Sequence, residues 1–237
     1  MGTDPRQAEA GFYATAQGAV ALRLVRERLV GLWPDMSGQS LLGLGHTEPY
    51  LRSWRETAAR CIAATPTPAV PGAWPGGGPS LACWVEANAL PFPGQSIDRI
   101  LLVHGLENAD NARRMLREVW RVLKDDGRLL VVAPNRVGLW AHVESTPFGQ
   151  GQPYSPGQIG RLLAASLFRV ERRDRVLYVP PSSRRFILRT ARLWERAGRR
   201  LVPQLAGLTI TEAVKDVYAA MPLAPSARRR FVLSEAA

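Results

Sequence analysis

Apolar residues along this chain recur in two rhythms, which predict strands alternating with helices. From Thr15 to Trp33 the apolar side chains form one helical stripe, with Arg23, Arg26 and Arg28 largely opposite. Short continuous apolar runs are instead typical of buried strands. The predicted strands span residues 40–45, 60–64, 81–85, 97–104, 128–133, 168–179 and 207–218. The predicted helices span residues 15–33, 49–59, 109–124, a segment opening at Ser155-Pro156, and 182–201, while residues 1–10 are expected to be loose.

The two clearest elements follow each other in the middle of the chain. Strand 97–104 holds an uninterrupted apolar run, Ile100 to Val103, which fits a central strand covered on both faces. In helix 109–124 the apolar residues repeat at steps of three and four, so they form one face. Asp125-Asp126-Gly127 then ends this helix.

The order of these elements predicts a mostly parallel, doubly wound α/β sheet. At 237 residues the chain is long enough for one such domain, which we assign to residues 1–222 with an N-terminal helical segment at 1–39. Residues 180–206 are predicted to be a basic helix inserted before the last strand, and residues 223–237 a flexible tail. Five prolines and four glycines between Thr65 and Ser80 predict an irregular connection.

Composition narrows the classes of protein that remain. No apolar run reaches the roughly 18 to 20 residues of a membrane-spanning helix, and no apolar signal-peptide segment follows the N-terminus. Cys61 and Cys83 are too few for a disulfide framework or a structural zinc site, and their apolar surroundings predict buried thiols. We therefore expect a cytoplasmic protein without a metal.

Positive charge is unevenly distributed along the chain. The net charge is +11, and 29 of the 31 basic residues are arginines. Residues 180–237 contain 11 basic residues against 4 acidic ones. Such a region attracts nucleic acid, anionic lipid or an acidic partner, although a solvated helix face is the simpler interpretation. Nucleic acid is the less favoured partner because no recognisable RNA-binding module is present.

The inserted helix at 182–201 is amphipathic. Phe186, Leu193 and Trp194 lie on one side, and arginines lie on the other side or at its borders. Three roles suit this pattern: a lid over a substrate site, a helix on an anionic membrane surface, or a contact with a protein partner.

Three short motifs carry a resemblance to a known family. They are Leu90-Pro91-Phe92-Pro93 before the fourth predicted strand, Leu106-Glu107-Asn108 after it, and Glu118-Val119-Trp120-Arg121-Val122-Leu123-Lys124 at the end of the next helix. Together, residues 86–135 resemble the type 11 domain of class I S-adenosylmethionine-dependent methyltransferases, in the branch with ubiquinone- and menaquinone-biosynthesis-like enzymes. The resemblance implies a Rossmann-like, seven-stranded fold with a helical insertion before the last strand, and S-adenosylmethionine as cofactor.

In that family a glycine-rich turn after the first strand brings backbone amides close to the cofactor. Here Gly45 is the one family glycine that is kept. Gly43 stands where the family has aspartate, and Thr47 and Pro49 stand where it has glycines.

Two carboxylates complete the family pattern: one after the second strand for the ribose and one after the third for the adenine. No acidic residue lies between Ile62 and Thr65, whereas Glu86 occupies the adenine-side position. The cofactor contacts that the resemblance implies are Gly43, Gly45, His46, Glu86, Ala87 and His104.

Methyl transfer needs positioning above all, and it needs a base only if the acceptor atom carries a proton. His104 ends the fourth predicted strand, at the edge where open α/β sheets bind ligands, so it is a candidate base or substrate contact. A packed histidine at a strand end is the alternative. The loop 135–154 has the mixed chemistry of a substrate pocket, or is a plain surface loop, and it adds His142 and Tyr154 as candidates.

The sequence therefore predicts an S-adenosylmethionine-dependent methyltransferase acting on a small-molecule acceptor. The alternative is a non-catalytic binding or partner protein on the same fold that has lost cofactor binding. An RNA-directed methyltransferase would account for the basic charge, but no RNA-binding module supports it.

Overall fold

The computed structural model describes residues 5–66 and 73–217, so the predicted tail at 223–237 lies outside the described residues. Within this part of the chain, seven strands form one sheet in the order β3-β2-β1-β4-β5-β7-β6. Strands β1 to β5 pair in parallel, and β7 runs antiparallel to β5 and β6. The strands are β1 (Ser40–Gly45), β2 (Arg60–Thr65), β3 (Ala82–Trp84), β4 (Ile97–Val103), β5 (Leu123–Pro134), β6 (Phe168–Val176) and β7 (Leu208–Lys215). The predicted mostly parallel sheet with a late returning strand is confirmed.

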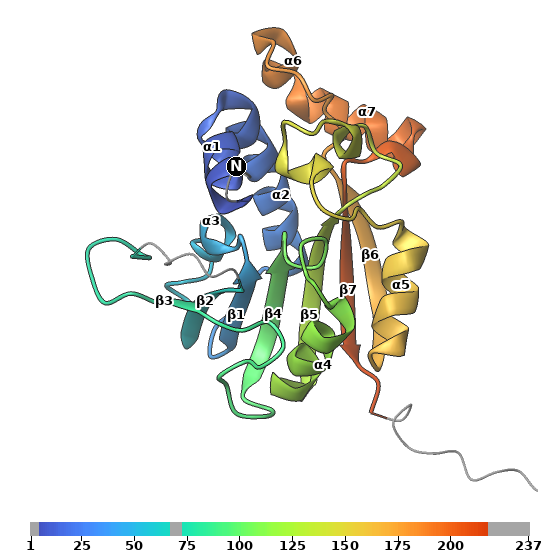
Figure 1. Ribbon diagram of the computed structural model, residues 1–237. Helices are drawn as coiled ribbons and strands as arrows, with labels where there is room; N and C mark the ends of the chain where they lie inside the picture. The colour runs from blue at the N-terminus through green and yellow to red at the C-terminus, as the bar shows by residue number, and fades with distance from the viewer. Residues whose placement is uncertain (1–4, 67–72, 218–237) are drawn as a thin grey trace, which may run out of the picture.

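Helices cover both faces of this sheet (Figure 1). Helices α4 and α5 lie on one face and α2 on the other. Helices α6 and α7 come between β6 and β7 in the sequence and lie beyond the end of the sheet. The helices are α1 (Pro5–Ala14), α2 (Ala16–Leu32), α3 (Glu48–Leu51), α4 (Ala112–Val122), α5 (Pro156–Ala165), α6 (Arg185–Arg189) and α7 (Ala191–Leu201), with 3-10 turns at Leu139–His142, Pro147–Gly149 and Pro203–Leu205.

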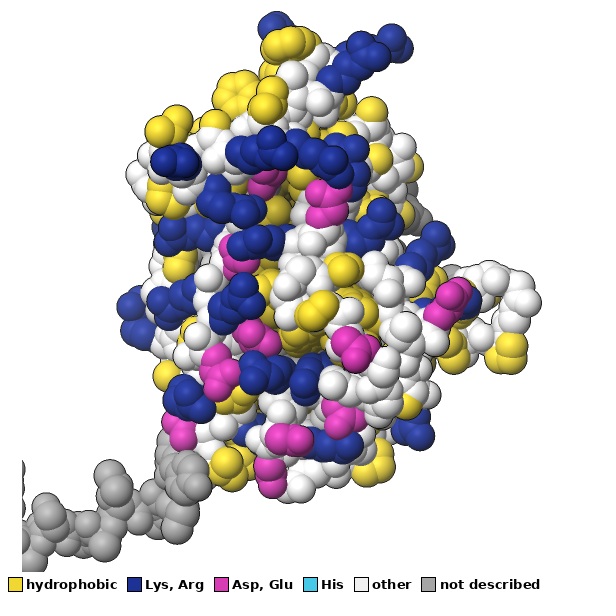
Figure 2. Space-filling model, turned by 180° about the vertical axis from the view of Figure 1, so that it is seen from behind, with side chains coloured by type: hydrophobic (Ala, Val, Ile, Leu, Met, Phe, Trp, Pro, Cys, Tyr) yellow, Lys and Arg dark blue, Asp and Glu magenta, His cyan; other side chains and the backbone are white. Residues whose placement is uncertain are grey.

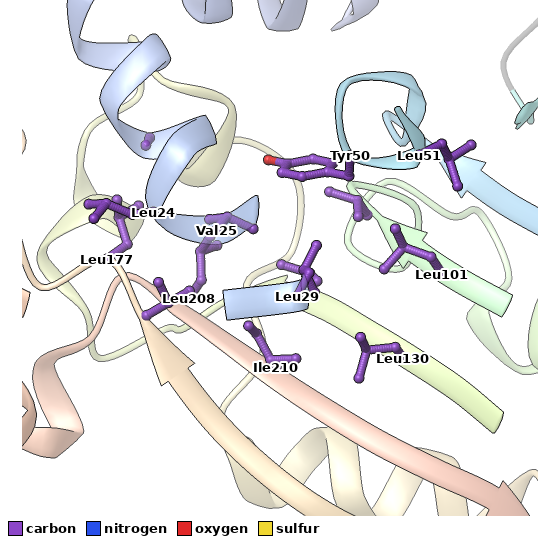
Figure 3. Packing of buried hydrophobic residues seen from close by; sticks show 14 of the residues in the cluster. Leu24, Val25, Leu29, Tyr50, Leu51, Leu101, Leu130, Leu177, Leu208 and Ile210 are labelled. Atoms are coloured by element: carbon purple, nitrogen blue, oxygen red, sulfur yellow. The ribbon is translucent and has the colours of Figure 1, made fainter. Parts of the chain in front are cut away.

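The apolar run in β4 is explained by its two covered faces. Alternate side chains of a strand point to opposite faces, and Ile100 and Leu102 pack with the apolar face of α4. Leu101 belongs to the cluster on the other face, together with Leu29 of α2 (Figure 3). Both faces of β4 are therefore covered by apolar side chains, which explains why the run Ile100 to Val103 contains no polar residue.

Two of the family motifs contact each other directly. The guanidinium of Arg121 donates to the backbone oxygens of Leu90 (2.8 Å) and Phe92 (2.9 Å). The Glu118 carboxylate pairs with Arg121 at 2.7 Å and accepts the N–H of Leu90 at 2.9 Å. These contacts fix the Leu90-Pro91-Phe92-Pro93 turn on α4. Glu118 and Arg121 of the motif therefore have a structural role.

The expectation of a loose N-terminus is wrong for residues 5–10, which belong to α1. Phe12 of α1 is buried, with its ring 6.1 Å from that of Trp140 and 5.5 Å from that of Phe148. Burial of such aromatic surface stabilises a helix that is short on its own. The partners are more than a hundred positions away, so local periodicity gave no sign of them.

Three predicted helices are shorter than expected. Helix 109–124 is helical only over α4, and Asp125-Asp126-Gly127, which were predicted to end it, lie within β5, since that strand already begins at Leu123. The segment 49–59 is helical only over α3 and then continues as turns. The segment 182–201 divides at Thr190 into α6 and α7, where the Thr190 hydroxyl donates to the Phe186 carbonyl at 2.9 Å. Such side-chain bonds to a preceding carbonyl compete with the regular helical pattern.

Candidate active site

A cavity of about 250 Å³ opens at the carboxyl ends of β1, β2 and β4. Parallel α/β sheets bind ligands at this edge, beside the point where the strand order reverses. Here the reversal lies between β1 and β4, which are neighbours in the sheet. The described residues that line the cavity are Glu9, Gly45, His46, Thr65, Pro66, Ala87, Asn88, His104, Gly105, Asn108, Ala109, Asp110, Asn111 and Met115.

The turn after β1 is pressed against the end of β4. Gly45 has φ +89°, and a Cβ there would clash with the Val103 carbonyl oxygen. The N–H of His46 donates to that same oxygen at 2.9 Å. Only glycine fits here, because the position needs both a left-handed backbone and a close backbone approach.

Gly43 and Thr47 fit together as a pair. Gly43 points at Thr47, whose side chain is fully buried and occupies the space that a Cβ on residue 43 would need. Compared with the family pattern, the strand position 43 thus has the smaller residue, glycine, and the turn position 47 has the larger one, threonine. The cavity is not filled by this exchange, because neither residue lines it.

Helix α1 closes one side of the cavity. Its Tyr13 ring stacks on the His46 ring, with centroids 4.7 Å apart and an interplanar angle of 7°. Its Glu9 carboxylate is buried and lies 3.4 Å from His46 Nδ1. The N-terminal helix thus contributes to the site itself.

His104 lies at the centre of a buried hydrogen-bond chain. Its Nδ1 is 3.0 Å from Glu107 Oε1, and its Nε2 is 2.9 Å from the Tyr13 hydroxyl. The Tyr50 hydroxyl in turn donates to that of Tyr13 at 3.3 Å. His104 has φ +52°, an uncommon conformation for a residue with a side chain, and such strain is concentrated at functional sites.

The surroundings shift the acid–base properties of this chain of side chains. Burial alone would lower the pKa of His104, but the hydrogen bond and negative charge of Glu107, together with Glu9, raise the pKa above its ordinary value. The pKa of Tyr13 is raised well above its ordinary value, chiefly by burial. The imidazole therefore binds its proton more tightly than a free histidine does.

The charge of the cavity is opposite to that of the chain. Its described lining includes the carboxylates of Glu9 and Asp110 and no lysine or arginine, although the chain carries 31 basic residues. A site with this lining favours a ligand that carries positive charge.

Residues 43–131 match the family model described as "Methyltransferase domain". Ubiquinone/menaquinone biosynthesis C-methyltransferase UbiE of Bordetella parapertussis is 44% identical over 59 residues, which are 25% of this chain and 22% of the relative. The match thus spans about a fifth of the length of that curated relative.

Solved structures extend the comparison to the whole fold. A SAM dependent methyltransferase from Archaeoglobus fulgidus has a TM-score of 0.60 at 18% identity, covering 82% of this chain and 94% of the other. Another from Aquifex aeolicus has a TM-score of 0.58 at 15% identity, covering 90% and 100%. Residues 43–131 are therefore similar to a methyltransferase domain. The chain as a whole has the class I methyltransferase fold.

Four of the six predicted cofactor contacts line the cavity: Gly45, His46, Ala87 and His104. Gly43 lies behind the turn, against Thr47. Glu86 is exposed at the end of β3 and does not line the cavity, whereas its neighbour Asn88 does.

The three candidate catalytic residues are not brought together. His142 is exposed, in the 3-10 turn at Leu139–His142, and Tyr154 is half-buried, with its hydroxyl 3.4 Å from the Leu106 carbonyl oxygen. Neither of them lines the cavity, whereas His104 does.

Sequence reasoning missed Glu9, Tyr13 and Glu107 as members of the site. Glu107 was noted only as part of a motif, yet its spacing of three from His104 was a usable signal. Glu9 and Tyr13 gave no comparable signal, since Glu9 lies in the segment expected to be loose and Tyr13 lies between that segment and the first predicted helix.

Proposed function

We propose that the cavity binds S-adenosylmethionine and that the chain transfers a methyl group to a small-molecule acceptor. The observation that carries this proposal is the acid-lined cavity at the switch point of a methyltransferase fold. S-Adenosylmethionine carries a sulfonium and an ammonium, both positive, so a described lining with two carboxylates and no lysine or arginine suits it.

The chemistry of the lining fits the remaining groups of that cofactor. Thr65 offers a hydroxyl and Asn88 an amide near the ends of β2 and β3, where a ribose and a base would lie. Gly105, Ala87 and Ala109 leave room for a flat ring. The volume of about 250 Å³ is below the roughly 300–1,000 Å³ of common ligand pockets, so we expect a close fit.

The bound cofactor supplies a methyl group activated by the sulfonium charge. The chain would hold it with the backbone beside Gly45 on one side and with Asn88 on the other, while Glu9 faces its ammonium group. Helix α1 would exclude water from one side of the site.

His104 is the residue proposed to handle the acceptor's proton. In its neutral form, Nδ1–H donates to Glu107 and Nε2 accepts from Tyr13. An acceptor that displaced the Tyr13 hydroxyl, or gave its proton through it, would leave that proton on Nε2. Glu107 would then stabilise the imidazolium.

A second candidate function is favoured by one observation. The helix after β1, α3, is only four residues long. In methyltransferases of this fold a longer helix follows the first strand and its N-terminus faces the cofactor. A non-catalytic binding protein on the same fold would account for this difference.

Calorimetric titration with S-adenosylmethionine and with its demethylated product separates the two candidates. We expect saturable binding of both. Ala87→Phe should weaken it at least tenfold by filling the cavity, while Ala89→Phe, two residues along the same exposed loop, should leave it intact. Absence of binding to the wild-type chain at about millimolar ligand, which corresponds to roughly −4 kcal/mol, would support the non-catalytic candidate.

A further inference from the structure

Helices α6 and α7 expose an unusual amount of apolar surface. Phe186 is 74% exposed, Leu193 61%, Trp194 41% and Leu201 74%. Four large apolar side chains so close together on one surface element mark an interaction site.

Helix α7 is divided lengthwise into three sectors. At 3.6 residues per turn, Ala191, Glu195 and Gly198 fall on one line, and all three are buried against the domain. The exposed arc contains an apolar sector beside a basic one. The apolar sector holds Leu193, Trp194, Ala197 and Leu201. The basic sector holds Arg196, Arg199 and Arg200, together with Arg192, which pairs with Glu27 of α2 at 2.8 Å.

The inner sector fixes the orientation of α7. The buried carboxylate of Glu195 accepts the backbone N–H groups of Leu177 (3.3 Å) and Tyr178 (2.5 Å) at the end of β6. Gly198 lies against the Tyr178 ring, where a side chain would clash. Because these contacts hold the helix in one rotation, the apolar and basic sectors stay on the outside.

These sectors lie at one end of the molecule. Helices α6 and α7 project beyond the sheet, at the end where β6 stops and β7 begins (Figure 1). At the same end in Figure 2, hydrophobic and basic side chains lie side by side on the surface. The surface is therefore accessible to a large partner.

We propose that α6 and α7 dock on an anionic membrane surface. A helix that lies in the interfacial plane has Trp, Phe and Leu on one side and arginine on the other. The described helices include none that is long and apolar enough to cross a membrane, so the contact is peripheral. The only acidic residue of the two helices, Glu195, faces inward, and the outer surface is complementary to lipid phosphates.

Two other partners explain less of the surface. A second copy of the chain would bring two sets of arginines together, which is repulsive. Nucleic acid would satisfy the arginines, but it would leave Leu193 and Leu201 without apolar contacts. A membrane surface satisfies both sectors at once.

Vesicle co-sedimentation tests this proposal, with the full chain and no added cofactor. We expect the chain to sediment with phosphatidylglycerol-containing vesicles and to stay in solution with pure phosphatidylcholine. The double variant Phe186→Ser/Leu193→Ser should lose at least tenfold in partitioning. Arg196→Gln/Arg200→Gln should lose roughly fivefold per arginine at low salt, and the loss should shrink as salt is raised.

Matched controls distinguish binding through α6 and α7 from non-specific electrostatic or hydrophobic binding to vesicles. Trp84→Ser removes an apolar side chain that is 53% exposed, in the edge strand β3, and Arg113→Gln/Arg117→Gln removes two exposed arginines of α4. Neither change should alter binding. Replacing Arg228, Arg229 and Arg230 with glutamine tests the C-terminal arginines in the same way.

Tryptophan fluorescence gives a second readout. Trp194 emission should shift to the blue when anionic vesicles are added, and the shift should be absent in Trp194→Phe but present in Trp84→Phe. Three results would overturn the proposal: no binding of the wild-type chain, equal binding of the apolar variant, or a dimer without vesicles that the apolar variant abolishes.

Discussion

Replacing Glu107 with glutamine tests the buried chain of hydrogen bonds around His104. The substitution keeps the shape of the side chain and removes its charge. Glu107 Oε1 lies 3.0 Å from His104 Nδ1, and the side chains are 0% and 2% exposed, so solvent does not screen the pair. In the variant, burial still lowers the pKa of His104, while the hydrogen bond from its Nδ1 no longer ends on a negative charge, so the part of the increase that comes from Glu107 is largely lost. We therefore expect the pKa of His104 to fall below that of a free histidine.

The size of the effect follows from the loss of one buried, charge-assisted hydrogen bond. Such bonds contribute about 1.5–3 kcal/mol, and removal of one partner of a buried ion pair costs about 3–5 kcal/mol. Because glutamine retains an acceptor, we expect a loss of about 2 kcal/mol in the free energy of unfolding at mildly acidic pH.

The sign of the pH dependence follows from linkage. In the wild-type chain the folded pKa of His104 is raised, so its stabilising contribution is complete below the unfolded pKa of about 6.5. This contribution is lost as pH rises through the folded pKa. In the variant the folded pKa is lowered, so stability is lost as pH falls. The difference between the two proteins should therefore grow toward acid pH.

Urea unfolding at about pH 5.5 and about pH 9 measures this difference, and NMR titration of the imidazole gives the pKa directly. Glu144→Gln, at an exposed position, makes the same charge change and should alter stability by less than about 0.5 kcal/mol. An unchanged His104 pKa, or a difference in stability that does not vary with pH, would refute the reasoning.

Three further predictions concern the frame of the site, each measured by thermal or urea denaturation. Gly45→Ala should cost at least about 2 kcal/mol more than Gly77→Ala, because both positions have positive φ but only Gly45 also faces a carbonyl oxygen; equal costs would remove the clash argument. Thr47→Val should be neutral within about 0.5 kcal/mol or stabilising, since the buried Thr47 hydroxyl has no hydrogen bond among the described residues; a large loss would contradict this. Arg121→Gln should cost roughly 1–2 kcal/mol by releasing the Leu90 turn, a modest value because the arginine is partly exposed; no change would show that the turn holds itself.

Much of the fold could be predicted from local patterns, because strands and helices differ in period. The run Ile100 to Val103 identified the central strand, and Ser155-Pro156 identified the start of α5, where the capping box is present. The short α3 could not be predicted, because the apolar spacing of residues 49–59 also suits turns that pack on the core.

The site was harder to predict than the fold because its members are far apart in sequence. His104 and Gly45 could be proposed from their places after predicted strands. Tyr13 could not, since its contact with His104 spans 91 positions and depends on α1 folding back over the sheet. The pairing of Gly43 with Thr47 likewise needs the structure, because the sequence showed only that two family residues were altered.

A crystal structure with the demethylated cofactor product tests the central claim most directly. The account predicts that the ligand lies in the cavity between Gly45 and Ala87, with its amino-acid end toward Glu9 and with His104 beside the sulfur. Density elsewhere, or an unchanged cavity at saturating ligand, would contradict it.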